Sequence, residues 1–249
     1  MTLRFRRILV NGMTFAVLVA GIAALFAGLA ENISLAAELI LLAAILDGLD
    51  GTLARALRAT SDFGERLDTY VDTVTFGVVP AVVTYQALWA DYGIWGAAAA
   101  AMLIVMAVLR FARGCSFPSL SGRHVFRGLP IPVSASWLAV LLLVTDKDLF
   151  GVMSFTADRG AVIGGYTVVA LAFSLLQISN VRYLKPSRRQ LRAAMLAVLV
   201  IGLVTRLPLT SFCAVATASV LVYVADGLRR HRARELLARQ EEHEAVLHR

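Results

Sequence analysis

The sequence predicts an all-α membrane protein, a polytopic bundle of about eight transmembrane helices. Hydrophobic residues make up 59% of the 249 residues, charged residues only 16%, and the mean hydropathy is +0.74. The apolar residues fall in long runs, and a soluble domain does not carry so many of them. The Lys and Arg residues gather in alternate connecting segments, as they do in the cytosolic loops of membrane proteins.

Eight apolar runs follow one another, and each is close to the roughly 20 residues that a helix needs to cross the hydrocarbon. A short polar turn, Glu31-Asn32, separates the first two runs, whereas only Arg206, Pro208 and their neighbours separate the last two. We therefore predict membrane helices over residues 8–30, 33–57, 64–90, 94–112, 129–145, 161–179, 190–206 and 209–227.

The distribution of basic residues sets the expected orientation. With the N-terminus in the cytosol, all but three of the 24 Lys and Arg residues fall on the cytosolic side, the exceptions being Lys147, Arg159 and Arg206. This bias predicts an integral, multi-pass protein with both termini in the cytosol. The net charge of +7 then reflects topology and contact with anionic membrane lipids, not binding of nucleic acid. We expect one transmembrane domain over residues 1–228 and a charged, helical cytosolic tail over residues 229–249.

Four aspartates lie in the stretch 47–72, which reads DGLDGTLARALRATSDFGERLDTYVD. Asp47 and Asp50 form one pair and Asp68 and Asp72 a second, and the helical spacing within each pair puts its two carboxylates on one face. Acids with such apolar flanks are costly in a membrane and are therefore functional candidates. One or two divalent cations would relieve their mutual repulsion, and ligands that are all oxygen favour a hard ion such as Mg²⁺ or Mn²⁺.

Three further residues of this stretch suit a phosphorylated substrate. Gly51 and Gly64 have no side chain and allow a ligand or another backbone to come close. Arg55 is always charged and can hold a phosphate with its planar guanidinium group. Two metal ions at such a site stabilise both the attacking and the leaving oxygen of a phosphoryl displacement. The stretch therefore favours an enzyme that acts on a diphosphate substrate.

The pattern D-x-x-D-G-x-x-A-R-x₈-G-x-x-x-D-x-x-x-D, from Asp47 to Asp72, resembles the CDP-alcohol phosphotransferase (phosphatidyltransferase) family of integral membrane enzymes. The resemblance implies that Asp47, Asp50 and Asp68 bind metal, and that Asp72 both contacts metal and acts as the general base. It also implies a homodimer, and it assigns contacts with the CDP-linked lipid to a set of small or polar residues. These are Asn11 and Thr14, in VNGMTF, together with Gly51, Ala54, Arg55, Ser61 and Gly64.

Three stretches resemble one branch of this family, the bacterial and archaeal phosphatidylserine synthases. TSDFGERLDTYVDTVTFGVVPA, RFARG and FRGLPIPVSA are similar to motifs of that branch, although Thr69, Tyr70, Val71 and Thr75 replace residues common there. The resemblance implies transfer of the phosphatidyl group of CDP-diacylglycerol to L-serine, with release of CMP. It also implies a prokaryotic cytoplasmic membrane with the active site facing the cytosol. Choline, inositol or glycerol phosphate stay open as alternative acceptors.

The charge near the last aspartate bears on the choice of acceptor. An acceptor that carries its own phosphate needs dedicated cations beside the base, yet Asp72 is followed by TVTFGVV, without Lys or Arg. Arg110, Arg113 and Arg127, in the next cytosolic segment, are candidate contacts for a phosphate or for the acceptor.

A cation transporter is a second class of function that places acids within the membrane. The clustering of the four aspartates toward one face of the membrane favours the enzyme over the transporter. Release of CMP from CDP-diacylglycerol, compared with ion uptake into vesicles, separates the two.

Overall fold

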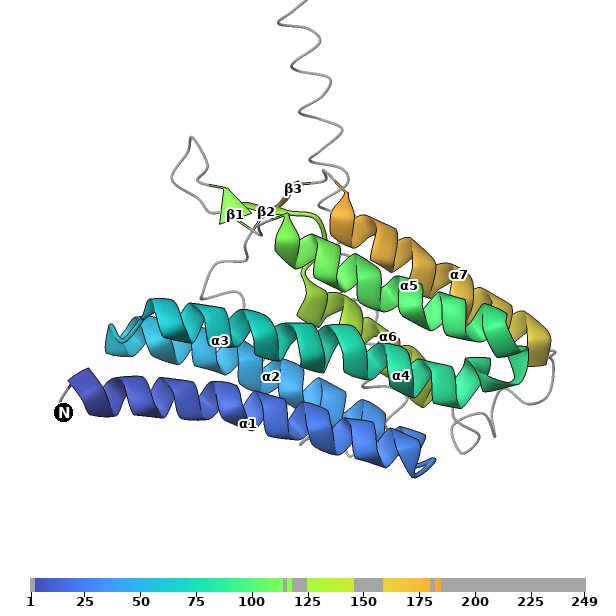
Figure 1. Cartoon of the computed structure of the whole chain (residues 1–249), viewed down its shortest axis with the longest axis horizontal. Coiled ribbons are helices and arrows are strands. Elements are labelled where there is room, and N and C mark those ends of the chain that lie inside the picture. Colours follow the sequence, from blue (N-terminus) through green and yellow to red (C-terminus); the bar gives the residue numbers. More distant parts are fainter. Residues whose placement is uncertain (1–2, 114–115, 118–124, 146–158, 180–181, 185–249) are drawn as a thin grey trace, which may run out of the picture.

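The structure is a computed structural model that describes residues 3–113, 116–117, 125–145, 159–179 and 182–184. Helices α1 (Leu3–Leu29) and α2 (Ile33–Leu57) form an antiparallel hairpin (Figure 1). In the turn between them, Glu31 has a φ of 62°, and the side chain of Asn32 caps α2 by accepting a hydrogen bond from the Leu35 amide (3.1 Å). The hairpin confirms that the first two predicted runs are helices joined by a short polar turn.

The third predicted run forms one long helical segment whose geometry changes along its length. It starts as α3 (Asp62–Asp72), passes through the π-helical η1 (Thr73–Val78), α4 (Val79–Thr84) and π-helical η2 (Tyr85–Trp89), and ends in η3 (Ala90–Tyr92). Pro80 accounts for the first π-helical turn, because it has no amide hydrogen to donate to the turn before it. At Gly93, which has a φ of 54°, the chain reverses into α5 (Gly93–Ala112) (Figure 1).

The remaining described helices are α6 (Ile131–Thr145) and α7 (Arg159–Ile178), so the fourth, fifth and sixth predicted runs are helical as well. The runs predicted at 190–206 and 209–227, and the tail over 229–249, lie outside the described residues. Within the described chain, two helical stretches, Phe5–Leu29 and Asp62–Ala112, are long and apolar enough to cross a membrane by length and composition. The number of crossings and the side on which the termini lie stay predictions.

A small antiparallel sheet departs from the purely helical prediction. Strands β1 (Ser116–Phe117), β2 (Val125–Arg127) and β3 (Arg182–Leu184) pair in that order. Strands of two or three residues are too short to show the alternation of apolar and polar residues that identifies a strand in a sequence. They pair because the ends of α5 and α7 bring the adjoining segments to the same end of the bundle (Figure 1).

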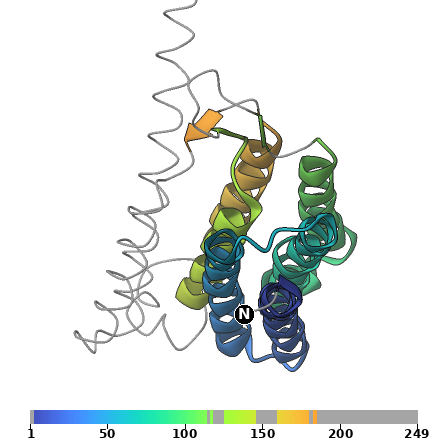
Figure 2. The ribbon, with the colours of Figure 1, turned by 90° about the vertical axis from the view of Figure 1, so that its left-hand side faces the viewer.

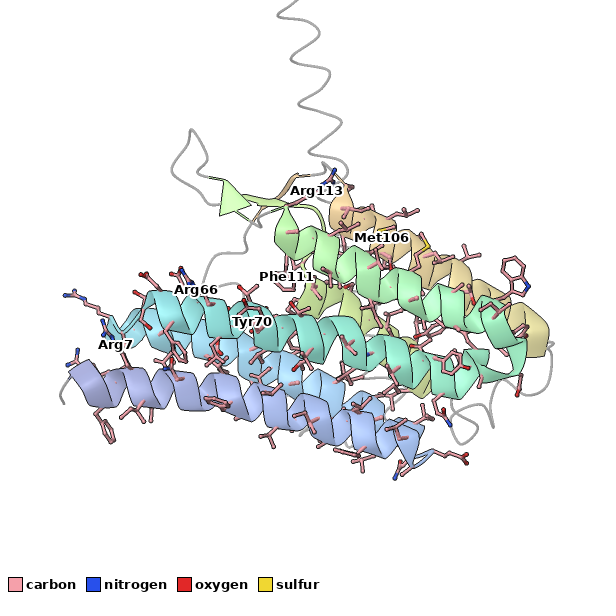
Figure 3. The ribbon with its side chains drawn as sticks, viewed as in Figure 1. Arg7, Arg66, Tyr70, Met106, Phe111 and Arg113 are labelled. Atoms are coloured by element: carbon pink, nitrogen blue, oxygen red, sulfur yellow. The ribbon has the colours of Figure 1, made fainter. Side chains whose placement is uncertain are left out.

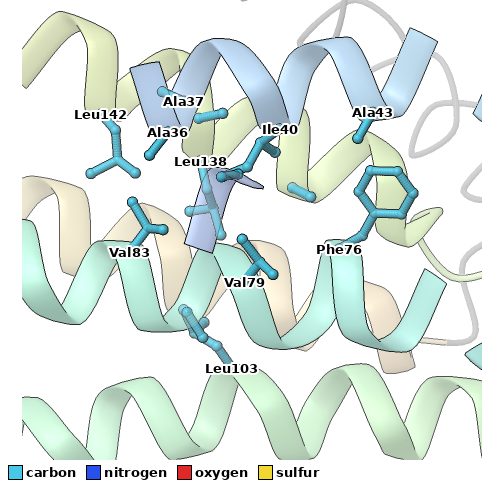
Figure 4. Packing of buried hydrophobic residues seen from close by; sticks show 14 of the residues in the cluster. Ala36, Ala37, Ile40, Ala43, Phe76, Val79, Val83, Leu103, Leu138 and Leu142 are labelled. Atoms are coloured by element: carbon cyan, nitrogen blue, oxygen red, sulfur yellow. The ribbon is translucent and has the colours of Figure 1, made fainter. Parts of the chain in front are cut away.

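The helices pack in two layers, which Figure 2 shows nearly end on. One layer contains α1, the α3–α4 segment and α5, and the other contains α2, α6 and α7. Buried alanines of α2 (Ala36, Ala37 and Ala43) face Val79 and Phe76 across the interface (Figure 4). Such small residues allow helix backbones to approach closely. The α1–α2 hairpin is thereby held firmly against the α3–α4 segment, which carries the second pair of aspartates.

Gly128 lies where the loop before α6 touches the end of α7. The Leu129 amide donates to the Leu176 carbonyl (3.0 Å), and Gly128 itself has a φ of 76°. A Cβ at this position would collide with the carbonyl oxygen of Gln177. The loop therefore requires a residue that has no side chain and tolerates the left-handed region.

We expect Gly128→Ala to lower the Tm of the purified protein by several degrees. The left-handed backbone and the collision each cost on the order of 1–3 kcal/mol. Gly164→Ala, on α7, is the matched control, because no heavy atom lies within 4 Å of a Cβ there. Alanine in a helix is favoured over glycine, so the control should keep or slightly raise the Tm. Equal Tm values for the two variants would contradict this account of the loop.

Candidate metal and active site

A short connection turns the two aspartate pairs toward each other. α2 ends at Leu57, after which Arg58 adopts a φ of 49° and the Ala59 amide donates back to the Ala54 carbonyl (3.1 Å), as in a Schellman-type helix end. Ser61 then caps α3, and its hydroxyl accepts a hydrogen bond from the Gly64 amide (3.1 Å). Because the connection is so short, the last turns of α2 lie beside the first turns of α3.

Asp47 and Asp50 of α2 and Asp68 of α3 meet at the centre of the site. One carboxylate oxygen of each lies within 4.8 Å of those of the other two. Asp50 is buried, and the other two are half-buried. Carboxylates this close repel one another strongly where little water is present. The arrangement is therefore suited to hold a cation.

Asp72 lies beside this cluster, one turn farther along α3. Its carboxyl group is within hydrogen-bonding reach of that of Asp47. Its Oδ1 atom is buried and has no hydrogen-bond partner among the described residues. The structure thus gathers three of the four predicted metal ligands, Asp47, Asp50 and Asp68, in one group. It places Asp72 next to the group with an oxygen that can accept a ligand or a proton.

α1 contributes two polar side chains to the same place. The hydroxyl of Thr14, which is buried, donates to Asp50 Oδ2 (3.0 Å). A contact of this kind fixes the orientation of a carboxylate that binds metal. Asn11 Oδ1 and Ser61 Oγ lie 3.3 and 3.2 Å from the position of a Cβ at Gly64, so any side chain there would press on both. The structure therefore brings Thr14 against Asp50 and brings Asn11, Ser61 and Gly64 together at the start of α3, and the contacts of these four residues with a nucleotide stay predictions.

Of the remaining predicted residues, the structure describes Gly51 and Ala54 but not the side chains of Arg55 and Arg127. Gly51 and Ala54 are partly buried on the last turns of α2, in the helix that carries Asp47 and Asp50. The side chains of Arg55 and Arg127 lie outside the part that the structure describes, so the contacts predicted for them are not tested.

Two of the predicted arginines contact the end of α7. Arg110 is buried and donates from Nη1 to the Gln177 carbonyl (3.1 Å), and Arg113 donates to the Ile178 carbonyl (2.7 Å). Cations at a helix C-terminus stabilise its last carbonyl groups. Contact of either arginine with a phosphate or an acceptor stays a prediction. Our sequence reasoning did not identify Gln177, although an amide side chain among the apolar residues of α7 is a signal that could have flagged it.

The residues of the site fit a divalent metal ion. The three converging ligands offer only carboxylate oxygens, which hard cations such as Mg²⁺ and Mn²⁺ prefer. The buried Oδ1 of Asp72, which lacks a partner among the described residues, is consistent with a ligand that binds there. Asp47, Asp50 and Asp68 would hold the ion, and the donor set does not distinguish Mg²⁺ from Mn²⁺.

Comparison with known proteins agrees with this site. The model of the CDP-alcohol phosphatidyltransferase family matches residues 7–176. A CDP-diacylglycerol–serine O-phosphatidyltransferase of Helicobacter pylori is 30% identical over 191 residues, which cover 76% of this chain and 78% of the relative. Proteins with the same name from Mycobacterium leprae and Methanocaldococcus jannaschii are 38% identical over 151 residues and 34% identical over 148 residues. These cover 58% and 59% of this chain, and 49% and 63% of the respective relatives.

The family match spans all four aspartates, Asn11 and Thr14 of α1, and helices α2 to α6. It confirms the resemblance that the spacing from Asp47 to Asp72 indicates. The chain belongs to the CDP-alcohol phosphatidyltransferase family of enzymes.

Proposed function

We propose that the protein transfers the phosphatidyl group of CDP-diacylglycerol to the hydroxyl of L-serine, which forms phosphatidylserine and releases CMP. The convergence of Asp47, Asp50 and Asp68 within 4.8 Å carries the proposal, because phosphoryl transfer to a hydroxyl depends on such a cation site. The printed names of the relatives support serine as the acceptor.

In the proposed reaction, Asp47, Asp50 and Asp68 hold one or two divalent ions. When bound, these ions neutralise the diphosphate and stabilise the charge that develops on the attacking and leaving oxygens. The serine hydroxyl attacks the lipid-linked phosphorus, a new P–O bond forms, and the bond from that phosphorus to the oxygen of CMP breaks. Asp72 accepts the hydroxyl proton, since a hydroxyl is a poor nucleophile at neutral pH. Its buried Oδ1, without a partner among the described residues, is the atom that receives the proton.

The remaining site residues position the lipid nucleotide. Gly51 leaves room for the diphosphate, and Gly64 allows Asn11 and Ser61 to come close to the start of α3, where their polar groups can meet the nucleotide. Thr14 holds Asp50 in place through its hydrogen bond. Ala54, like Gly51, is a small residue on the last turns of α2 and lets the lipid nucleotide come close. Arg55 binds a phosphate with its guanidinium group.

In this proposal the protein is an integral, multi-pass protein of a prokaryotic cytoplasmic membrane, with eight crossings, both termini in the cytosol, and a homodimeric assembly. The charge distribution supports the orientation. Arg7 and Arg66 lie at the end of the bundle that carries the connection between α2 and α3 (Figure 3), and Arg113 directly follows α5. Positive charge marks the cytosolic side, so the site faces the compartment that supplies soluble serine.

We expect the purified protein to release CMP from CDP-diacylglycerol in the presence of Mg²⁺ or Mn²⁺ and L-serine. Choline, inositol and glycerol 3-phosphate should give little CMP in parallel reactions, and mass spectrometry of the lipid product identifies the acceptor. Release of CMP with only one of the other three acceptors would assign a different alcohol to the same chemistry. Absence of release with every acceptor would contradict the enzymatic proposal.

A further inference from the structure

A buried polar cluster joins α5, α6 and α7 at the end of the bundle where the sheet lies. Gln177 of α7, which is 7% exposed, donates from Nε2 to the hydroxyl of Ser134 on α6 (2.6 Å). The Ser134 hydroxyl donates in turn to the Ile131 carbonyl (2.9 Å). Arg110 of α5 donates to the backbone carbonyl of Gln177 (3.1 Å). We call Arg110, Ser134 and Gln177 the Gln177 cluster.

One hydrogen-bond acceptor of the Gln177 cluster, the side-chain oxygen of Gln177, lacks a donor among the described residues. Gln177 Oε1 is buried and has no hydrogen-bond partner among the described residues. The orientation of the amide follows from its neighbour, because the single proton of the Ser134 hydroxyl goes to Ile131. Ser134 can then only accept from Gln177, which commits the amide nitrogen and leaves the amide oxygen for another donor. A buried acceptor without a donor is costly, so this atom points to a ligand.

The Gln177 cluster lies roughly level with the proposed base. α5 runs antiparallel to the α3–α4 segment, and a Cβ at Gly77 would lie 3.0 Å from the Cβ of Ala107. Arg110 lies one helical turn after Ala107 on α5, and Asp72 lies before Gly77 on the other segment. Because the two segments are antiparallel, both steps lead toward the same end of the bundle. Because η1 between Asp72 and Gly77 is π-helical and α5 is α-helical, both steps amount to only one or two helical turns, and Arg110 and Asp72 differ in height by less than about one turn. A small molecule that presents its hydroxyl to Asp72 is therefore at the right height to meet the cluster.

We infer that Gln177 Oε1 accepts a hydrogen bond from the ammonium group of the acceptor amino alcohol, which makes Gln177 a specificity-determining residue. This inference rests on the proposed function. A primary ammonium group carries N–H donors, whereas the quaternary ammonium of choline carries none. A phosphate-bearing acceptor would meet the negative end of the amide dipole instead.

The test compares three variants that separate the amide oxygen from the structural role of the cluster. Gln177→Leu removes both the oxygen and the bond to Ser134. Gln177→Glu keeps an oxygen acceptor at the same position. Ser134→Ala breaks the bond between the two residues but leaves Gln177 Oε1 in place. The readouts are the Tm and the separate KM values for serine and CDP-diacylglycerol, measured by CMP release.

We expect Gln177→Leu to raise the KM for serine by about tenfold to a hundredfold, the value of a lost hydrogen bond to a charged group. The KM for CDP-diacylglycerol should change much less. Gln177→Glu should restore most of the serine affinity, and Ser134→Ala should lower the Tm with a change in serine KM below about threefold.

Other results would overturn the inference in distinguishable ways. If Gln177→Leu and Ser134→Ala raise the KM for serine equally, Gln177 has only a structural role. An unchanged serine KM in a folded Gln177→Leu variant also refutes the inference while the proposed function stands. Absence of CMP release from the wild-type protein with serine refutes the proposed function itself, and the inference that rests on it.

Discussion

Asp72→Asn is expected to lower kcat for CMP release by at least a hundredfold, while the KM for CDP-diacylglycerol changes little. The substitution keeps the size of the side chain but removes its ability to accept the serine proton, and general base catalysis contributes about 10² to 10⁴ in rate. The lipid nucleotide is held mainly by other residues, so the loss falls on turnover. Steady-state kinetics with purified protein in detergent or nanodiscs measure both constants.

Asp62→Asn is the matched control for this experiment. Asp62 is also an aspartate of α3, but it is exposed and lies in the first turn, away from the carboxylate group. The control should keep near-normal kcat. Retention of turnover by Asp72→Asn would remove Asp72 as the base. A rise in KM with unchanged kcat would assign Asp72 to substrate binding instead.

Replacement of Asp47, Asp50 or Asp68 with Asn is expected to abolish activity at millimolar Mg²⁺ or Mn²⁺. Each variant loses one charged oxygen ligand from a group whose members lie within 4.8 Å of one another. Even partners that only orient a ligand contribute about 10- to 100-fold to metal affinity or activity, so a ligand itself should contribute more. Titration of CMP release with metal, and direct binding of Mn²⁺ followed by electron paramagnetic resonance, report the loss.

Glu38→Gln provides a control on the same helix as Asp47 and Asp50. Glu38 is exposed near the opposite end of α2, so its removal changes the charge of the helix without touching the site. It should leave the metal dependence unchanged. If all three Asn variants bound Mn²⁺ as tightly as the wild-type protein, the metal site described above would be wrong.

The local pattern of the sequence was sufficient to predict the helices and the convergence of the aspartate side chains. Apolar runs of membrane-spanning length predict six helical segments that the structure contains between Leu3 and Ile178. The spacing of Asp47, Asp50 and Asp68, with a short polar connection between the two pairs, places these carboxylates together, and the structure brings them within 4.8 Å. Both results follow from helical periodicity and chain connectivity, which act over a few residues.

Contacts between distant segments were decided only by the tertiary structure. The bond from Thr14 to Asp50, the contacts of Arg110 and Arg113 with the end of α7, and the three-stranded sheet all join residues far apart in the chain. Periodicity tells which face of a helix is buried, but not which neighbour covers it or at what height. Those depend on how closely the helices approach, and small residues such as Gly28 set that distance through contacts with other helices. Gln177 illustrates the limit, because its leftover oxygen is visible only once Ser134, Ile131 and Arg110 have been placed around it.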